Sequence, residues 1–217
     1  MNRREFFGVA GTLAVGLGLS GAALAAGPGG KLPPAGGAGA KTLDAALHAR
    51  QSQREYADKP LPESVLSDLL WACCGVNRPD SGKRTAPTAM NRQEVEVFVA
   101  RKDGLFLYDP KAHALQQKSA EDLRAATGKQ AYVGTAPVNL VYVADMARVA
   151  GGTQDEKCIT AGLDTAFMGQ NVYLFCAATG LATVARTGID VPALAKAMGL
   201  AANQRVIMAQ CVGYPKA

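Results

Sequence analysis

The spacing of hydrophobic residues alternates along the chain between the period of helices and the period of strands. A short amphipathic helix is predicted to begin after Thr42, which is suited to cap it, and a second is predicted to open at Pro62 and end at Gly75. The apolar stripe of the second helix is Val65, Leu66, Leu69, Leu70 and Cys73. Residues 77–92 are polar with interspersed prolines and glycine, and they predict a loop.

Two-residue alternation and β-branched runs predict strands further along the chain. Residues 95–99 and 105–108 flank a Lys-Asp-Gly turn signal, which is typical of a hairpin. The apolar run 138–144 predicts a central strand, and 205–212 predicts a last one. Because helices and strands mix without a regular βαβ repeat, the fold class expected is α+β.

The longest predicted helix covers residues 156–179 and is apolar nearly all round. Such a helix is expected to be buried on all sides, which a single small domain rarely achieves alone. Gly162 and Ala166, small and four residues apart, would let another helix approach closely, so we expect a homodimer. Gly180 is placed to end this helix, and Asp190 is placed to cap a further one.

The first residues resemble a targeting signal. Arg3-Arg4-Glu5-Phe6-Phe7 is a twin-arginine pattern, an uncharged stretch follows, and Ala23-Leu24-Ala25 is a small-residue cleavage site. The stretch is also near the length of a membrane anchor, but its frequent glycines and the cleavage site favour a signal peptide over residues 1–26, cut near Ala25/Ala26. We therefore expect periplasmic export, no stable membrane anchor, a flexible Gly/Pro/Ala linker over 27–41 and one domain over 42–217.

Composition excludes several classes of function. The net charge is +5 and no basic run is interleaved with aromatics, so nucleic acid is not expected as a partner. Two histidines and five cysteines without a C-x-x-C pair predict no metal site, although a disulfide remains open. The chain lacks a G-x-G-x-x-G after a strand, a phosphate-binding P-loop and a G-x-S-x-G nucleophile elbow.

The stretch from His48 to Tyr56 offers the clearest chemistry. Arg50 and Arg54 lie four residues apart with Gln51 and Ser52 between them, at the end of the first predicted helix. Guanidinium groups suit phosphate, and the amide and hydroxyl add neutral hydrogen bonds to an anion or a polyol. The same spacing also fits an ordinary solvated helix end.

Several segments, taken in order, resemble the FMN-dependent nitroreductase family. They are the Arg50–Arg54 run, Arg84-Thr85-Ala86-Pro87-Thr88-Ala89-Met90-Asn91-Arg92-Gln93, Gln130 with Ala136-Pro137-Val138, Gln170-Asn171, Gly180-Leu181 and Gly213-Tyr214-Pro215-Lys216. The resemblance runs from about Lys41 to the end of the chain and leans toward the branch that includes thiazole/oxazole-forming dehydrogenases. It implies a mostly antiparallel sheet flanked by helices, FMN as cofactor, and a homodimer.

The resemblance also implies roles for individual residues. Arg50 and Ser52 would hold the flavin phosphate, and Arg54 would lie near N1 and O2. The loop 184–188 would face N5, with the backbone N–H of Arg186 or Thr187 as donor. The cofactor-binding candidates are Arg50, Gln51, Ser52, Arg54, Pro87, Thr88, Ala89, Asn91, Gln130, Ala185, Arg186, Thr187 and Lys216, of which 87–91 would arrive from the partner subunit. No catalytic side chain and no metal ligand is implied.

The expected function is an exported FMN oxidoreductase that transfers a hydride or two electrons, in a ping-pong cycle, to small conjugated nitro-, quinone- or azoline-like molecules. The electron donor stays open between NAD(P)H, a quinol and a periplasmic protein, and the reaction could run in the oxidative direction. The alternative is a flavin-binding or scaffold protein that keeps the fold without turnover.

Overall fold

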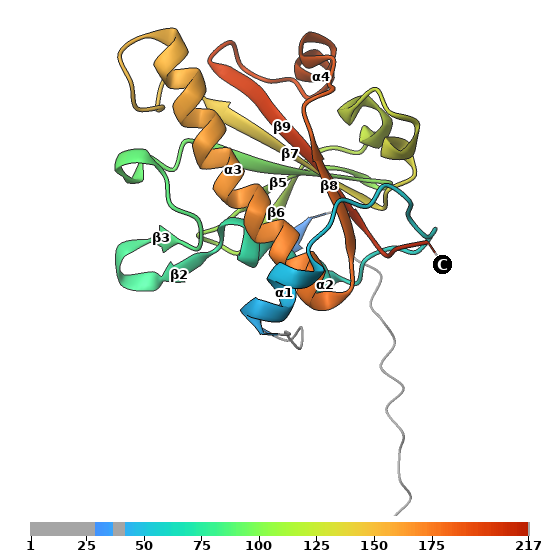
Figure 1. The fold of residues 1–217 in the computed structure, drawn as a ribbon. Helices are drawn as coiled ribbons and strands as arrows, with labels where there is room; N and C mark the ends of the chain where they lie inside the picture. Colours follow the sequence, from blue (N-terminus) through green and yellow to red (C-terminus); the bar gives the residue numbers. More distant parts are fainter. Residues whose placement is uncertain (1–28, 37–41, 217) are drawn as a thin grey trace, which may run out of the picture.

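The computed structural model describes residues 29–36 and 42–216 (Figure 1). The predicted signal peptide and part of the predicted linker lie outside these residues. The described part forms one antiparallel sheet of seven strands in the order β1-β6-β5-β4-β7-β9-β8, with helices on both faces. The α+β architecture with a mostly antiparallel sheet flanked by helices, which was expected from the sequence, is therefore confirmed.

The bounds of the main-sheet strands are β1 Gly30–Lys31, β4 Val95–Arg101, β5 Gly104–Asp109, β6 Ala114–Ser119, β7 Val138–Asp145, β8 Ala182–Arg186 and β9 Gln204–Gly213. The helices are α1 Leu43–Ala49, α2 Glu63–Cys74, α3 Gln154–Thr179 and α4 Val191–Ala197. Short 3-10 turns span Pro79–Ser81, Ala89–Asn91, Arg124–Thr127 and Ala131–Gly134.

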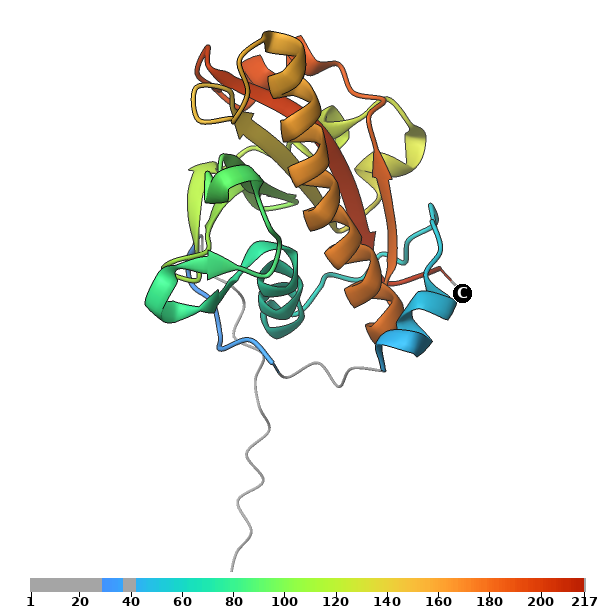
Figure 2. The same cartoon turned by 60° about the vertical axis from the view of Figure 1, so that its left-hand side comes forward.

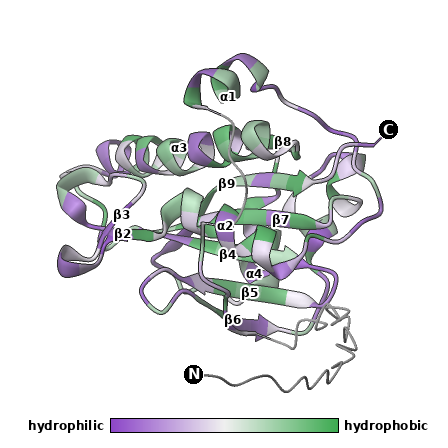
Figure 3. Ribbon diagram, turned by 90° about the horizontal axis from the view of Figure 1, so that it is seen from below, coloured by the Kyte–Doolittle hydropathy of each residue, from purple (hydrophilic) through white to green (hydrophobic). Residues whose placement is uncertain are grey.

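Strand β7 lies in the interior of the sheet, as its β-branched run predicts. It pairs with β4 on one side and β9 on the other, and every residue of it except Asp145 is buried. Figure 3 shows hydrophobic residues dominating the strands around it, whereas the edge strand β6 carries more hydrophilic ones. Because both faces are covered, alternation on these strands marks two core layers rather than a buried and a solvated face.

Helices α2 and α3 cover one face of the sheet, and α4 packs on the other (Figures 1 and 2). Local signals fix the helix ends as predicted: Thr42 caps α1 through its hydroxyl, and Gly75 and Gly180 lie at the ends of α2 and α3. The first turn of α3 adds a capping box between Thr153 and Glu156. None of the helices among the described residues is both long and apolar enough to cross a membrane.

Helix α3 is not enclosed by its own chain, in line with the expectation that a single small domain rarely buries such a helix on all sides. Ile159, Leu163 and Phe167 remain 64%, 57% and 47% exposed, and they share one face at helical spacing. A side chain added at Gly162 would meet nothing within 4 Å. Exposed contiguous apolar faces of this kind mark contact surfaces.

The predicted flexible linker over 27–41 is wrong for residues 29–36, which dock on the domain. Strand β1 pairs with the edge strand β6, and Leu32 is only 5% exposed within the core against α2. The carbonyl of Pro33 accepts a hydrogen bond of 2.6 Å from the Ser67 hydroxyl, and His113 approaches the same carbonyl at 3.0 Å. A single leucine thus anchors a segment whose composition alone predicts a spacer.

Two predicted loops contain strands. The segment 77–92 includes the hairpin β2 (Val76–Arg78) and β3 (Lys83–Arg84), which Arg78 reinforces with a 2.7 Å hydrogen bond to the Arg84 carbonyl. The predicted loop 184–188 is strand β8 as far as Arg186, and only Thr187 and Gly188 continue as loop. Strand β6, which is polar in sequence, was not predicted.

Candidate functional site

The arginine-containing segment that follows α1 runs along the edge strand β8. The amide of Gln53 donates to the carbonyl of Thr183 at 2.9 Å, and Tyr56 forms an isolated antiparallel bridge with Pro215. The amide of Lys216 reaches the Glu55 carbonyl at 3.3 Å. The exposed residues Arg50, Gln51, Ser52 and Arg54 therefore lie at the same edge of the sheet as Lys216, from which almost the whole domain separates them in sequence.

Tyr173, on the last two turns of α3, joins this segment to β8. Its hydroxyl accepts a 3.0 Å hydrogen bond from the amide of Ala185 and lies 2.8 Å from the Ser52 hydroxyl. The Arg50 guanidinium carbon lies 5.4 Å from the centre of the Tyr173 ring, within cation–π range. One side chain thus gathers three of the predicted cofactor residues, Arg50, Ser52 and Ala185.

Sequence reasoning missed Tyr173, although it lies two residues after the Gln170-Asn171 motif. The apolar pattern around Tyr173 predicts only a buried helix, whereas the Tyr173 hydroxyl accepts a hydrogen bond from the adjacent strand β8. A polar aromatic at the half-buried rim of a helix is the signal that could have identified it.

Gln130 packs against the turn that follows β8, close in sequence to Ala185 and Arg186. The amide of Lys129 donates to the Gly188 carbonyl at 3.0 Å, and a side chain added at Gly188 would lie 2.5 Å from the Gln130 amide nitrogen. The side-chain carbonyl oxygen of Gln130 is buried and receives no hydrogen bond from the part of the chain that the structure describes. This packing needs glycine at position 188 and leaves an acceptor that a ligand could satisfy.

The Arg186 side chain is not at the surface where a ligand-facing loop would place it. It is 7% exposed and donates to the Thr127 carbonyl and hydroxyl, to Asn139 at 2.8 Å and to the Cys211 sulfur at 3.4 Å. Burial raises the pKa of the Cys211 thiol, and the Arg186 charge opposes that shift. Of the two predicted donors in this loop, Thr187 is the exposed one.

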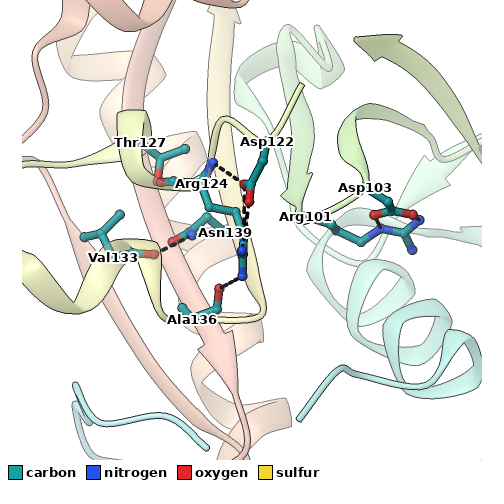
Figure 4. Close-up of polar contacts among 8 residues, drawn as sticks. All are labelled: Arg101, Asp103, Asp122, Arg124, Thr127, Val133, Ala136 and Asn139. Carbon is teal, nitrogen blue, oxygen red and sulfur yellow. Dashed lines mark hydrogen bonds and ion pairs between the residues drawn. The ribbon is translucent and has the colours of Figure 1, made fainter. Parts of the chain in front are cut away.

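Further polar contacts stiffen the segment that carries Gln130 (Figure 4). Arg124 forms an ion pair of 2.8 Å with Asp122 and donates to the Ala136 carbonyl at 3.2 Å. Asn139 donates to the Val133 carbonyl at 3.0 Å, so it bridges this segment and Arg186. The 3-10 turns on either side of Gln130 are therefore tied to β7 and to the Ala136 carbonyl.

The predicted residues 87–91 lie elsewhere along α3. The amide of Ala89 donates to the Asp164 carboxylate at 2.8 Å, and the hydroxyl of Thr88 accepts from the Gln93 amide at 2.9 Å. Asp164 precedes Tyr173 by nine residues, which is about 13 Å along a helix axis. Within one chain, the structure therefore separates 87–91 from the Arg50 cluster.

A groove of about 990 Å³ is lined by none of the predicted cofactor residues. Its apolar lining includes Pro60, Leu61 and Pro137, and Arg101 and Arg124 lie on its walls. Figure 4 shows both arginines, each paired with an aspartate. Since its charges are neutralised and none of the predicted cofactor residues line it, it is not the candidate site.

Most of the thiols lie away from solvent. All five cysteines are free thiols, and four of them are buried. Burial raises the pKa of the Cys176 thiol well above its ordinary range. No group of three or more His, Cys, Asp or Glu side chains is placed to hold a metal ion in the described part of the chain.

The sheet covered by helices on both faces, with charged and polar residues gathered at its β8 edge, defines a three-layer α+β protein. The chain belongs to the nitroreductase family, whose sequence pattern matches residues 47–214. A Methanocaldococcus jannaschii protein named as a nitroreductase is 30% identical over 152 residues, which are 65% of this chain and 76% of that one.

Solved structures give the same result. A nitroreductase-type protein from Ralstonia eutropha JMP134 superposes with a TM-score of 0.83 at 37% identity, covering 88% of this chain and 91% of that chain. The NADPH:FMN oxidoreductase of Vibrio harveyi, solved with NAD+, superposes with a TM-score of 0.60 at 20% identity, covering 81% of this chain and 69% of that one. At that identity the second likeness concerns the fold alone.

Proposed function

We propose that this protein is a homodimeric FMN-dependent oxidoreductase whose flavin phosphate is bound beside Tyr173. The observation that carries the proposal is the convergence of Arg50, Ser52 and the Ala185 amide on the Tyr173 side chain. Membership of the nitroreductase family supports an oxidoreductase. The FMN oxidoreductase among its structural neighbours supports the choice of FMN.

The residues at β8 fit the chemistry of FMN. Arg50 and Ser52 offer a charged and a neutral donor to a phosphate, and each charged hydrogen bond contributes roughly 1.5–3 kcal/mol. Arg54 would bring positive charge toward N1 and O2, with Gln51 and Lys216 at the same edge. The buried Gln130 oxygen lacks a donor, which a ribityl hydroxyl or the ring N–H would supply.

Bound FMN would supply the hydride and two-electron chemistry itself, so the chain has to bind, orient and shield it. Thr187 and Gly188 follow directly after β8, where a backbone N–H could face the ring. The glycine at 188 is packed against Gln130, which fixes that turn. No side chain is required as a general acid, because solvent or substrate can deliver the proton.

A homodimer would complete the site. The exposed face of α3 carries Ile159, Leu163 and Phe167, and α1 beside it exposes Leu43 and Leu47 at 66% and 53%. Covering such a face removes apolar area from water. A second copy seated there would bring its own segment 87–91 toward the Arg50 cluster, from which the same segment of one chain is separated.

The substrates we propose are small conjugated nitro-, quinone- or azoline-like molecules, in keeping with the resemblance to the branch that includes thiazole/oxazole-forming dehydrogenases. The N-terminal twin-arginine pattern supports export of the folded, flavin-loaded protein to the periplasm. There the electron donor would be a quinol or a periplasmic protein rather than cytosolic NAD(P)H.

The test is the Arg50→Ala variant. The parent protein should bind FMN with a yellow spectrum and sediment as a dimer. Arg50→Ala should remain dimeric and bind FMN about 10- to 100-fold more weakly, as the loss of one charged interaction requires. Full flavin occupancy in Arg50→Ala would refute the phosphate assignment.

The matched control is Arg205→Ala. Arg205 is exposed on β9, eight residues and therefore roughly 26 Å from the end of that strand beside Tyr56. The Arg205→Ala variant should bind FMN with the same affinity as the parent protein. A monomeric parent, or a parent that stays colourless in excess FMN, would contradict the proposal itself.

The rival is a flavin-binding protein without turnover. Photoreduced protein that is reoxidised by nitro compounds or quinones supports the oxidoreductase. Protein that stays bleached with every acceptor, oxygen included, supports the rival.

A further inference from the structure

The turn 88–93 holds three residues in the left-handed backbone region although none of them is glycine. Met90, Asn91 and Gln93 have φ angles of +54°, +53° and +51°. Such residues are uncommon and cost of order 1 kcal/mol or more each. A strained turn persists only where its surroundings over-determine it, so the contacts that hold it are informative.

Two charged side chains hold this turn at its ends. Asp164 of α3 accepts the amide of Ala89 at 2.8 Å. Arg148, from the connection between β7 and α3, donates to the carbonyls of Arg92 and Gln93 at 2.8 and 2.9 Å. The turn is thus clamped between an anion at its start and a cation at its end.

Glu94 follows the turn directly and is fully buried. Neither of its carboxyl oxygens receives a hydrogen bond from a donor group among the described residues. The carboxyl of Asp164, itself 3% exposed, lies against it within hydrogen-bonding reach when one of the two is protonated. Two buried carboxyls in contact cannot both ionise without a large cost, whereas one proton between them supplies the missing donor.

We propose that Glu94 and Asp164 share a single proton, and that this shared proton positions the turn 88–93 by keeping the Asp164 carboxylate on the Ala89 amide. Glu94 holds the proton and donates it to Asp164, which keeps its negative charge for Ala89. When solvent base removes the proton, two carboxylates face each other and Asp164 is driven from its position. The turn then loses the contact that fixes its start.

The charged groups that face Glu94 support this direction. Burial raises the pKa of Glu94 to about 7, the Asp164 charge adds to the increase, and Arg148 opposes it. A carboxyl whose pKa is raised in the folded state favours that state at low pH. The stabilisation by protonated Glu94 is complete below the pKa that this carboxyl has when the turn is open and solvent reaches it. The stabilisation is lost progressively as pH rises through the folded-state pKa of about 7.

The functional consequence rests on the proposed function, which assigns Thr88, Ala89 and Asn91 to the flavin site of the partner subunit. If the shared proton orders the turn, FMN affinity should weaken from pH 6 to pH 8. Glu94 and Asp164 are then positioning residues, because they touch the turn and not the cofactor.

Hydrogen–deuterium exchange of the Ala89 amide tests the proposal without any flavin. After correction for intrinsic exchange, protection in the parent should fall about tenfold between pH 6 and pH 8, as the linkage of one proton requires. Glu94→Gln keeps a neutral donor toward Asp164, so its protection should be high and independent of pH. Glu96→Gln, on the same strand and hydrogen-bonded to Gln204, should keep the dependence of the parent.

Asp164→Asn provides a second variant in case Glu94→Gln does not fold. Its amide can donate to Glu94 while its oxygen accepts from Ala89, so the pH dependence should become weaker than in the parent, because ionised Glu94 no longer faces a second carboxylate. Equal pH dependence in the parent and in these variants would overturn the proposal, as would a parent whose protection does not change.

FMN titrations separate this result from the proposed function. If FMN binds to the parent but with the same affinity at pH 6 and pH 8, the positioning role is refuted and the flavin assignment stands. If FMN does not bind at all, the exchange experiment still decides the shared proton, and the flavin assignment fails.

Discussion

Replacing Tyr173 by phenylalanine removes one oxygen atom from the contact that assembles the candidate site. That oxygen accepts the Ala185 amide at 3.0 Å and lies 2.8 Å from the Ser52 hydroxyl. A buried amide without an acceptor costs about 1–3 kcal/mol. Because Ala185 is half-buried and water can partly replace the acceptor, we expect a loss of about 1–2 kcal/mol.

Urea and thermal unfolding measure this loss. For a domain of this size, each kcal/mol lowers Tm by about 2–4 °C, so the Tm of Tyr173→Phe should fall by about 2–8 °C. Tyr132→Phe is the matched control, because Tyr132 is also half-buried but its hydroxyl has no hydrogen-bond partner within the described chain. Its unfolding free energy should stay within about 0.5 kcal/mol of the parent value.

The same variant should weaken FMN binding, because Ser52 loses its anchor and the Arg50 segment loses part of its order. The expected change is about tenfold, which is the equivalent of about 1.4 kcal/mol. A Tyr173→Phe protein with parental stability and parental FMN affinity would refute the view that α3 organises the phosphate-binding segment.

Two further predictions concern the buried network and the N-terminal segment. Arg186→Lys should lower the free energy of unfolding by about 2–4 kcal/mol, because an ammonium group cannot span the acceptors that the planar guanidinium reaches. The control Arg205→Lys, on the surface, should change the free energy of unfolding by less than about 0.5 kcal/mol. Equal effects of the two substitutions in urea denaturation would contradict the network. Leu32→Ala should cost about 2–3 kcal/mol because Leu32 is buried against α2, whereas an unchanged midpoint in urea would show that residues 29–36 behave as the spacer that their composition suggests.

Helix ends and the central strand could be predicted because their signals are local. Thr42, Gly75 and Gly180 satisfy or terminate the backbone hydrogen bonds of a helix wherever the helix packs. The run 138–144 could be recognised as central because only a strand covered on both faces carries so few polar residues. Such features depend on a few neighbouring residues, so one sequence suffices to find them.

Edge elements could not be predicted, because tertiary pairing decides them. Strand β6 reads as polar, and β1 is two residues of a Gly/Pro-rich stretch. Each becomes a strand because an edge with free backbone groups lies beside it. The same reasoning explains residues 77–78 and 83–84, whose hairpin is stabilised by Arg78 rather than by a hydrophobic pattern.

The candidate site was only partly visible in sequence for a different reason. Arg50, Ser52 and Ala185 belong to motifs, but Tyr173 joins them through a hydroxyl that no short pattern marks. Glu94 alternates with valines as a surface residue would, and its burial follows from the turn before it. A lone acidic residue such as Asp164 inside an apolar helix was the available clue, since an uncompensated charge there requires a partner.

Different sides of helix α3 carry the residues of the candidate site and the exposed apolar residues of the proposed dimer interface. Asp164 and Tyr173 are nine residues apart, so at about 100° per residue they project from opposite sides of the helix. The exposed residues Leu163 and Phe167 lie on one of the two arcs between them. A second copy covering that face would be flanked by the Tyr173 cluster on one side and by the turn held by Asp164 on the other, as the proposed site shared between two subunits requires.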